Sequence, residues 1–212
     1  MKILNQKILI IDDHLVVRKG IELILKDKLT NPQIFEAENY SDALEIVNTI
    51  KIDLIILDII INGKEDITIM KEFKKIQNHL KILILSCHEE EFYGLRYLKN
   101  GADGYLQKFS SEDNINFAIT NVLKNGFYYS ENLQEKLLNL KNTKVLSNPI
   151  DSLSNREFEI AKMLVDGSGN LEIANKLNIQ MSTVSTYKNR VFEKLDISNI
   201  VALSDLFREE NT

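Results

Sequence analysis

Charged and hydroxyl-bearing side chains follow four short apolar runs of the chain, at the point where each run ends. In chain order, the groups that end these runs are Asp12 with Asp13, Asp58, Ser86 and Lys108. Short runs that are almost wholly apolar form strands buried on both faces of a parallel sheet. The carboxyl ends of parallel strands meet at one edge, where such sheets bind ligands. We therefore expect these five side chains to share one site.

The residue types at this site suit a phosphoryl group and a divalent cation. Clustered carboxylates repel each other in an apolar cleft unless a cation joins them. Mg²⁺ is the hard, oxygen-binding ion that we expect there, with Mn²⁺ as another possibility. With a metal present, one carboxylate can act as a nucleophile toward a phosphoryl group. Ser86 and Lys108 would then hydrogen-bond and neutralise the incoming phosphoryl oxygens.

Other interpretations of these groups stay open on the residues alone. Each charged residue could simply end its strand at the solvent, which explains any one of them well but five groups on four strand ends poorly. A site that only binds metal would leave Lys108 without a purpose. A metal-dependent phosphotransferase or phosphatase acting on small molecules would need a substrate pocket, and the sequence offers no additional binding loops.

Apolar strands alternate with amphipathic helical stretches along residues 1–126. Five strands alternating with five helices predict a doubly wound α/β domain with a five-stranded parallel sheet, because right-handed crossovers place every strand's carboxyl end on the same edge. Residues 127–149 have the character of a linker with one short helix, and Pro149 is a helix breaker. Residues 150–212 show no strand signal and predict a small all-α domain of four helices.

The composition indicates a cytoplasmic chain without a membrane-spanning segment. No apolar run approaches the roughly 18 residues that a membrane-spanning helix needs. The 212 residues carry a formal net charge of −5, so any DNA contact must come from a local basic patch. The single cysteine, Cys87, rules out an intramolecular disulfide and fits a reducing compartment. We expect Cys87 to be a packed small residue.

A helix-turn-helix pattern lies in the second and third of the four C-terminal helices. Residues 173–177 belong to the first helix of the pattern and residues 182–195 to the second. Val184, Val191 and Leu195 form the buried stripe of the second helix. The residues that we expect to contact DNA are Ser182, Thr183, Ser185, Thr186, Lys188, Asn189 and Arg190. Short hydroxyl and amide side chains can approach base edges in a major groove, while the basic side chains and Thr183 can contact phosphates.

The charge of this region supports DNA binding only modestly. Residues 176–195 carry four basic side chains against one acidic side chain, a net of +3 in a chain whose net charge is −5. From charge alone, a small helical protein–protein module is nearly as good an interpretation as a DNA-binding domain.

Residues 7–125 resemble the receiver domain of bacterial two-component response regulators, in particular the NarL/FixJ subgroup. The resemblance is carried by the order and spacing of Asp12-Asp13, Asp58, Ser86, Tyr105 and Lys108, and by the stretches 12–20 and 101–108. It implies a flavodoxin-like fold with strand order 2-1-3-4-5 and makes Asp58 the phosphoacceptor. It also implies that Asp13 and Asp58 bind Mg²⁺ directly and that Asp12 binds it through water. The main-chain carbonyl of Ile60 would be a further ligand.

The same resemblance implies a role for two further groups and a class of protein. Ser86 and Tyr105 match the family's switch pair, in which the hydroxyl follows the phosphoryl group and the aromatic ring turns inward. A receiver catalyses only its own phosphoryl transfer and dephosphorylation, so the chain is not expected to be an enzyme that turns over a metabolite.

Residues 150–208 resemble a LuxR-type helix-turn-helix domain, which favours DNA over a protein partner. The matching stretches are 153–160, 170–174, 183–187 and 194–195. The last helix, about residues 200–208, resembles the dimerising helix of that class. The combined resemblance implies a transcription regulator whose partners are a sensor histidine kinase, double-stranded DNA and a second copy of the chain.

The loop after Asp58 departs from the family's pattern. Ile61 and Asn62 stand where Met-Pro is frequent. Asp66 stands where glycine is frequent, and Gly63 is displaced from that position. A phosphorylation-independent DNA binder with a degenerate receiver is therefore a rival interpretation, although the intact set of five chemical groups argues against it.

Overall fold

The computed structural model describes residues 4–61, 64–65, 67–142 and 149–209. It divides the chain into two compact units, Met1–Asn142 and Thr143–Thr212. Within the described ranges, no helix is long and apolar enough to cross a membrane. The departures from the family pattern at residues 62, 63 and 66 lie outside the described residues.

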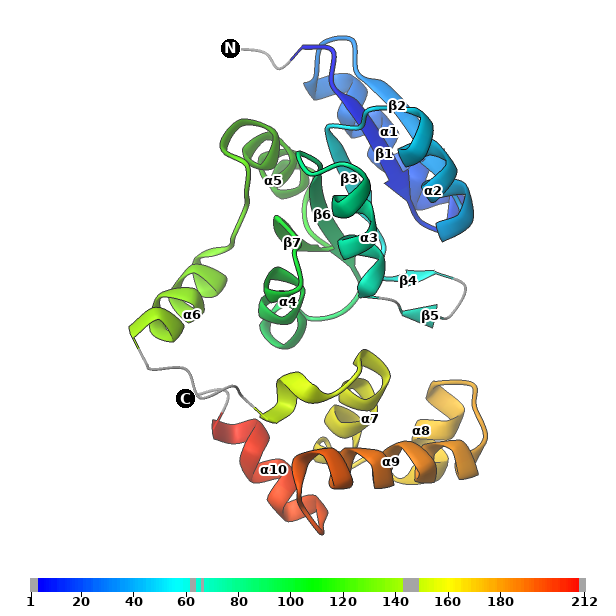
Figure 1. Cartoon of the computed structure of the whole chain (residues 1–212), viewed down its shortest axis with the longest axis vertical. Helices are drawn as coiled ribbons and strands as arrows, with labels where there is room; N and C mark the ends of the chain where they lie inside the picture. The colour runs from blue at the N-terminus through cyan, green and yellow to red at the C-terminus, as the bar shows by residue number, and fades with distance from the viewer. Residues whose placement is uncertain (1–3, 62–63, 66, 143–148, 210–212) are drawn as a thin grey trace. The chain divides into compact units, whose positions relative to one another are not determined.

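A five-stranded parallel sheet forms the centre of the first unit (Figure 1). Its strands are β1 (Lys7–Ile11), β2 (Gln33–Ala37), β3 (Leu54–Leu57), β6 (Lys81–Ser86) and β7 (Gly104–Gln107). The order across the sheet is β2-β1-β3-β6-β7, which confirms the predicted doubly wound order 2-1-3-4-5. β3 lies in the middle of the sheet and is buried along its whole length, as its unbroken apolar sequence predicts.

Helices follow the strands of this unit, and sequence signals mark several of their ends. They are α1 (Leu15–Lys28), α2 (Tyr40–Thr49), α3 (Thr68–Ile76), α4 (Glu90–Lys99), α5 (Glu112–Asn125) and α6 (Glu131–Asn142). Asn39 and Ser111 cap α2 and α5, because their side chains accept hydrogen bonds from main-chain N–H groups three residues on. Gly126 ends α5 with a φ of 87°, the left-handed conformation that glycine adopts most easily.

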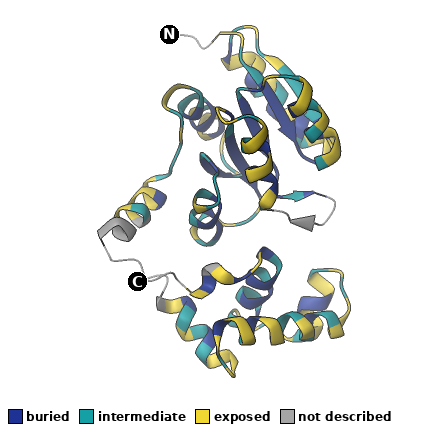
Figure 2. Cartoon of the chain, in the orientation of Figure 1, coloured by how far each residue is buried: buried dark blue, intermediate teal, exposed yellow. Residues whose placement is uncertain are grey.

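Side chains along each strand alternate between the two faces of the sheet, as the two-residue repeat of a strand requires. On one face, the residues packed with α1 and α5 in a single buried cluster include Ile8, Ile10, Leu54, Ile56, Leu83 and Leu85. Figure 2 shows the strands buried and the outer faces of the covering helices exposed. The charged residues at the carboxyl ends of the strands are therefore carried by a closely packed base.

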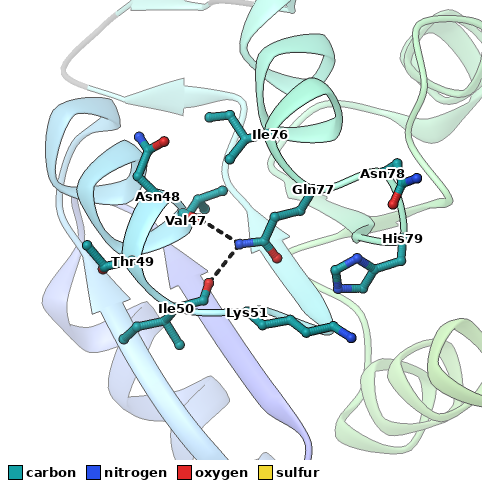
Figure 3. A pocket seen from close by; sticks show the side chains of 9 residues that line it. All are labelled: Val47, Asn48, Thr49, Ile50, Lys51, Ile76, Gln77, Asn78 and His79. Carbon is teal, nitrogen blue, oxygen red and sulfur yellow. Dashed lines mark hydrogen bonds between the residues drawn. The ribbon is translucent and has the colours of Figure 1, made fainter.

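The side chain of Gln77 joins the end of α3 to the end of α2 (Figure 3). Its amide nitrogen donates to the carbonyl oxygens of Val47 and Ile50 at 2.6 and 2.7 Å. Its amide oxygen accepts from the N–H of Ile52 at 2.9 Å. These bonds satisfy carbonyl groups that the end of α2 leaves without helical partners. The residues that line the hollow of about 300 Å³ around Gln77 therefore have a structural role, since they connect α2 and α3 through hydrogen bonds.

Parts of this unit differ from the sequence prediction. β4 (Ile60–Ile61) and β5 (Lys64–Glu65) form an antiparallel pair where the sequence predicts a loop. Cys87 is exposed rather than packed, because the chain leaves the sheet where β6 ends. α6 belongs to the first compact unit, and Tyr128 forms an isolated bridge to Gly104 of β7. The division into parts 1–126, 127–149 and 150–212 remains a prediction.

Every regular element of the second unit within residues 149–209 is a helix, as predicted. Its helices are η1 (Pro149–Ser152), α7 (Asn155–Val165), α8 (Asn170–Lys176), α9 (Met181–Leu195) and α10 (Ile200–Glu209). Ser154 and Glu157 form a reciprocal capping box at the start of α7. The rings of Phe158 and Phe207 stack between α7 and α10 with their centroids 5.5 Å apart. Val191 of α9 is fully buried, so α9 is held by its apolar stripe.

Candidate functional site

Asp12, Asp58 and Lys108 meet at the carboxyl edge of the sheet. The ammonium nitrogen of Lys108 lies 2.6 Å from Asp12 Oδ2 and 2.8 Å from Asp58 Oδ2. Asp12 and Asp58 are only 2% and 5% exposed, so water screens these contacts little. Because β1 pairs directly with β3, the two carboxylates follow neighbouring strands. The structure thus brings three of the predicted site residues together as one buried charge cluster.

Burial and the ion pairs act in opposite directions on these groups. Burial raises the pKa of the Asp58 carboxyl above its usual range, and the hydrogen bonds from Lys108 and from the Ile60 N–H offset this only in part. Burial also opposes the charged form of Lys108, but the hydrogen bonds to Asp12 and Asp58 outweigh it and raise the pKa of Lys108. Lys108 is therefore a positive charge at neutral pH beside the Asp58 carboxylate.

Arg18, a buried residue of α1, supports Asp12 from the main-chain side. Its Nη1 donates to the carbonyl oxygen of Asp12 at 2.7 Å. The same guanidinium donates to Glu36 at 3.0 Å and to Glu38 at 2.6 Å. A planar guanidinium holds several acceptors in fixed directions, so it ties the start of the β1–α1 connection to β2 and the residue after it. The sequence does not reveal these bonds of Arg18, because its acidic partners lie 18 and 20 residues further along the chain.

Asp12, Asp13, His14 and Asp58 each place one possible ligand atom within 4.8 Å of the others. Three of these four residues are carboxylates, and hard divalent cations prefer oxygen ligands. The acidic cluster therefore fits a divalent cation, as predicted. His14 is 68% exposed, and its Nδ1 lies 2.7 Å from Asp13 Oδ1. Ile60, whose carbonyl is a predicted ligand, donates its N–H to Asp58 Oδ1 at 3.1 Å.

Ser86 and Tyr105 are linked through the main chain of His88. The His88 N–H donates to Ser86 Oγ at 3.1 Å, and the His88 carbonyl accepts from the Tyr105 hydroxyl at 3.1 Å. Ser86 and Tyr105 are both fully buried. Since β6 is the direct neighbour of β3, Ser86 lies on the strand beside the one that Asp58 follows. The sequence around His88 gives no signal for this role, because the main chain of His88 bridges the two predicted switch residues only in the folded structure.

The predicted DNA-contacting residues lie on α9. Ser182, Thr186, Asn189 and Arg190 are exposed, whereas Thr183, Ser185 and Lys188 are partly buried. A hollow of about 350 Å³ is lined by Ser182, Thr183, Thr186, Tyr187 and Arg190. The structure therefore brings four of the seven predicted residues together around one concave surface.

Some polar side chains of this helix are also bonded within the unit. Ser185 Oγ accepts from the side-chain amide of Asn170 at 3.1 Å. The Thr186 hydroxyl donates to a main-chain carbonyl of its own helix at 3.0 Å. Lys194, which contributes to the local basic charge of the sequence, pairs with buried Glu157 at 2.7 Å. The basic charge that α9 directs outward therefore comes mainly from its other cationic side chains.

Comparison with known proteins matches each unit to a family. Residues 8–120 match the response regulator receiver domain, and residues 151–207 match the bacterial regulatory proteins of the luxR family. This chain belongs to the response regulators. It is a two-component response regulator with a DNA-binding LuxR-type domain, a transcription regulator rather than a conventional enzyme. The match of the second unit decides against a protein–protein module.

Known response regulators are similar to it over nearly the whole chain. Fimbriae Z protein from Escherichia coli (strain K12) is 34% identical over 199 residues, which cover 93% of this chain and 94% of that protein. Response regulator GacA from Pseudomonas aeruginosa is 30% identical over 199 residues, which cover 93% of each chain.

A solved structure supports the fold of the whole response regulator. RcsB from Salmonella enterica serovar Typhimurium, bound to promoter rprA in the presence of the phosphomimetic BeF3-, matches with a TM-score of 0.57 and 23% identity. The match covers 95% of this chain and 98% of that chain. At this identity the likeness concerns the fold.

Proposed function

We propose that phosphorylation of Asp58 by a sensor histidine kinase switches this response regulator and so controls its sequence-specific binding to DNA. The observation that carries the proposal is the 2.8 Å contact between buried Asp58 and Lys108 at the carboxyl edge of the sheet. A carboxylate oxygen of Asp58 attacks the phosphorus of a phosphohistidine on the kinase. The P–N bond breaks, its electron pair stays on the histidine nitrogen, and an acyl phosphate forms on Asp58.

Lys108 and Ser86 receive the new phosphoryl oxygens in this proposal. The Lys108 ammonium already lies between two carboxylates, and a small movement turns it toward a phosphoryl group on Asp58. Charge-assisted hydrogen bonds of this kind are stronger than neutral ones. Ser86 supplies a hydroxyl from the neighbouring strand. Its movement toward the phosphoryl group is the signal that we expect Tyr105 to follow.

Asp12, Asp13 and Asp58 would hold a divalent cation, which we propose to be Mg²⁺, with the main-chain carbonyl of Ile60 as a further ligand. The support is the donor set, which offers three carboxylates whose ligand atoms gather within 4.8 Å. When bound, the cation supplies positive charge that offsets the repulsion between these carboxylates and an incoming phosphoryl group.

In the second unit, we propose that α9 contacts the major groove of double-stranded DNA. The support is the exposure of Arg190, Asn189 and Thr186 on one helix, beside a hollow of about 350 Å³. Lys188 and Arg190 supply the phosphate contacts. We also propose a homodimer that contacts two half-sites, with Ile200 and Val201, two adjacent exposed apolar residues of α10, as its candidate contacts.

Mg²⁺-dependent labelling of the full chain by acetyl phosphate tests the proposal. We expect intact mass and peptide mapping to find one phosphoryl group, on Asp58, in the wild type. Asp58→Asn should take up none, because an amide cannot replace the carboxylate nucleophile. Asp113→Asn removes an exposed carboxylate of α5 and should label like the wild type.

Two results would contradict the role of Asp58. One is a phosphoryl group that persists on Asp58→Asn. The other is a folded wild-type chain that takes up no phosphoryl group, which would make the protein a DNA binder controlled in another way.

A further inference from the structure

Helix α6 packs beside α4 in the receiver (Figure 1). The missing side chain of Gly94 in α4 allows the close approach. A Cβ atom added to Gly94 of α4 would lie 2.9 and 3.0 Å from the two terminal carbons of Leu133 in α6. Real Cβ atoms essentially never come within 3.0 Å of another heavy atom, so a side chain at Gly94 would force Leu133 to shift. Leu133 is fully buried. The contact is therefore close-packed.

Polar bonds hold the start of α6 on the same part of the receiver. The Ser130 hydroxyl donates to Glu90 of α4 and accepts from the main-chain N–H of Leu133 at 3.2 Å, which caps α6. Just before, the Tyr128 N–H donates to the carbonyl of Asp103 at 2.9 Å, beside β7. The segment that leads out of the receiver is thus docked by both apolar and polar contacts.

The same helix α4 also contacts Tyr105 and the ring of His88, the residue that links the two predicted switch residues. The His88 ring stacks on Tyr93 of α4 with the centroids 4.4 Å apart. The main chain of His88 hydrogen-bonds both Ser86 and Tyr105 at 3.1 Å. The ring of Tyr97, also on α4, lies 6.0 Å from that of Tyr105 between centroids. α4 is therefore in contact with Tyr105, with the ring of His88 and with α6.

We propose that α6 is a latch, closed on α4 in this structure and opened when Asp58 is phosphorylated, so that the connection to the DNA-binding unit is released. This inference rests on the proposed role of Asp58. A phosphoryl group on Asp58 draws the Ser86 hydroxyl toward its oxygens and away from the His88 N–H. His88 then loses a bond that holds its ring on α4. α4 shifts beneath Leu133, where close packing leaves no spare room and the contact breaks.

Hydrogen exchange of the α6 amides in the full chain tests the latch, with Mg²⁺ and beryllofluoride as the phosphoryl mimic. We expect exchange in residues 131–142 to rise about tenfold when beryllofluoride is added to the wild type, and not in Asp58→Asn. Gly94→Val should raise this exchange without beryllofluoride, because valine needs the space of Leu133. Gly20→Val is the matched control, since a Cβ on this helical glycine meets no atom within 4 Å.

A second pair of variants keeps the test decisive where Gly94→Val does not fold. Leu133→Ala removes the buried contact, and Leu138→Ala removes an exposed leucine of the same helix. Only Leu133→Ala should raise α6 exchange without beryllofluoride. Equal exchange in the two variants overturns the latch. Unchanged α6 exchange in a wild-type chain that is phosphorylated on Asp58 also overturns it, and leaves the proposed function intact. Failure of acetyl phosphate to label Asp58 overturns both.

Discussion

The proposed phosphoacceptor site and the proposed DNA-contacting helix α9 handle polar groups in opposite ways. In the receiver, Asp12, Asp58 and Lys108 are removed from water and bonded to one another at 2.6 and 2.8 Å. On α9, Thr186 and Arg190 remain exposed, and the Thr186 hydroxyl bonds to the main chain of its own helix. The first arrangement holds charges in one geometry that suits the proposed phosphorylation. The second leaves polar side chains exposed to solvent, as the proposed contact with a duplex requires.

The two regions should therefore respond differently to mutation, one through fold stability and the other through DNA affinity. Removing one partner of a buried charge cluster leaves an uncompensated charge, so it should act first on the stability of the fold. An exposed charge contributes little to stability but can neutralise a phosphate, so its removal should act on DNA affinity. Variants can therefore test whether stability and affinity separate along the boundary between the two regions.

The largest expected effect is that of Lys108→Ala. It leaves the buried carboxylates of Asp12 and Asp58 side by side without their cation, so we expect the free energy of unfolding of the receiver to fall by about 3 kcal/mol in EDTA. Urea unfolding, monitored through hydrogen exchange of the β3 amides, measures this free energy of unfolding. Lys26→Ala, which removes an exposed lysine paired with Glu22, is the control and should change stability by less than about 0.5 kcal/mol. Equal losses of stability in Lys108→Ala and Lys26→Ala would show that the buried charge cluster is no more important for folding than an exposed ion pair.

Arg190→Ala should act on affinity and not on stability. We expect DNA binding by the full chain to weaken about tenfold, because the proposed contact of this exposed guanidinium with the duplex is lost. Fluorescence anisotropy with a site obtained by in vitro selection measures the affinity, and thermal unfolding measures the stability. Asn175→Ala, at an exposed position of α8, is the control. A variant of Arg190 that unfolds more easily but binds as the wild type does would contradict the assignment of this face to DNA.

The smallest expected effect concerns Glu157, a buried acidic residue of the second unit. It tests whether a buried charge also stabilises the unit that we propose to bind DNA. Burial acts to raise the pKa of the Glu157 carboxyl, but hydrogen bonds from Lys194 and Ser154 outweigh it and hold that pKa below its usual value of 4.5. The ionised form therefore adds stability above about pH 4.5, and this stability is lost as the pH falls through the lower folded-state pKa. We expect a loss of about 1 kcal/mol, limited because Lys194 is partly solvated.

Urea midpoints of the second unit, measured at decreasing pH, test the role of Glu157. Glu157→Gln should flatten the acid dependence, because the amide does not titrate over this range. A variant whose stability falls with pH as steeply as that of the wild type would show that other carboxyls set the acid limit.

The strand ends and the helix stripes were predictable because their signals are local. An apolar run followed by a carboxylate predicts a buried strand that ends at a ligand-binding edge, and Asp12, Asp58 and Lys108 do meet at that edge. The spacing of Val184, Val191 and Leu195 likewise predicts the side of α9 that is buried. In both cases the element's own period determines which side chains face the core.

Other features could not be predicted because they depend on partners far along the chain. Arg18 supports Asp12 only through the glutamates of β2 and the residue after it. Lys194 has the same charge as the lysines that face solvent, and only packing of α9 on α7 places it 2.7 Å from Glu157. Its pairing reduces the basic charge that the sequence alone suggests for DNA.

The class of this protein can be inferred from contiguous segments of the chain, because the order of strand ends and the helix-turn-helix pattern are local properties. How the parts of the receiver are joined depends on the folded structure. That structure shows His88 between Ser86 and Tyr105, and Leu133 of α6 packed on Gly94 of α4. Such contacts arise when separate helices and strands close around one core, so no local period or spacing in the chain contains them.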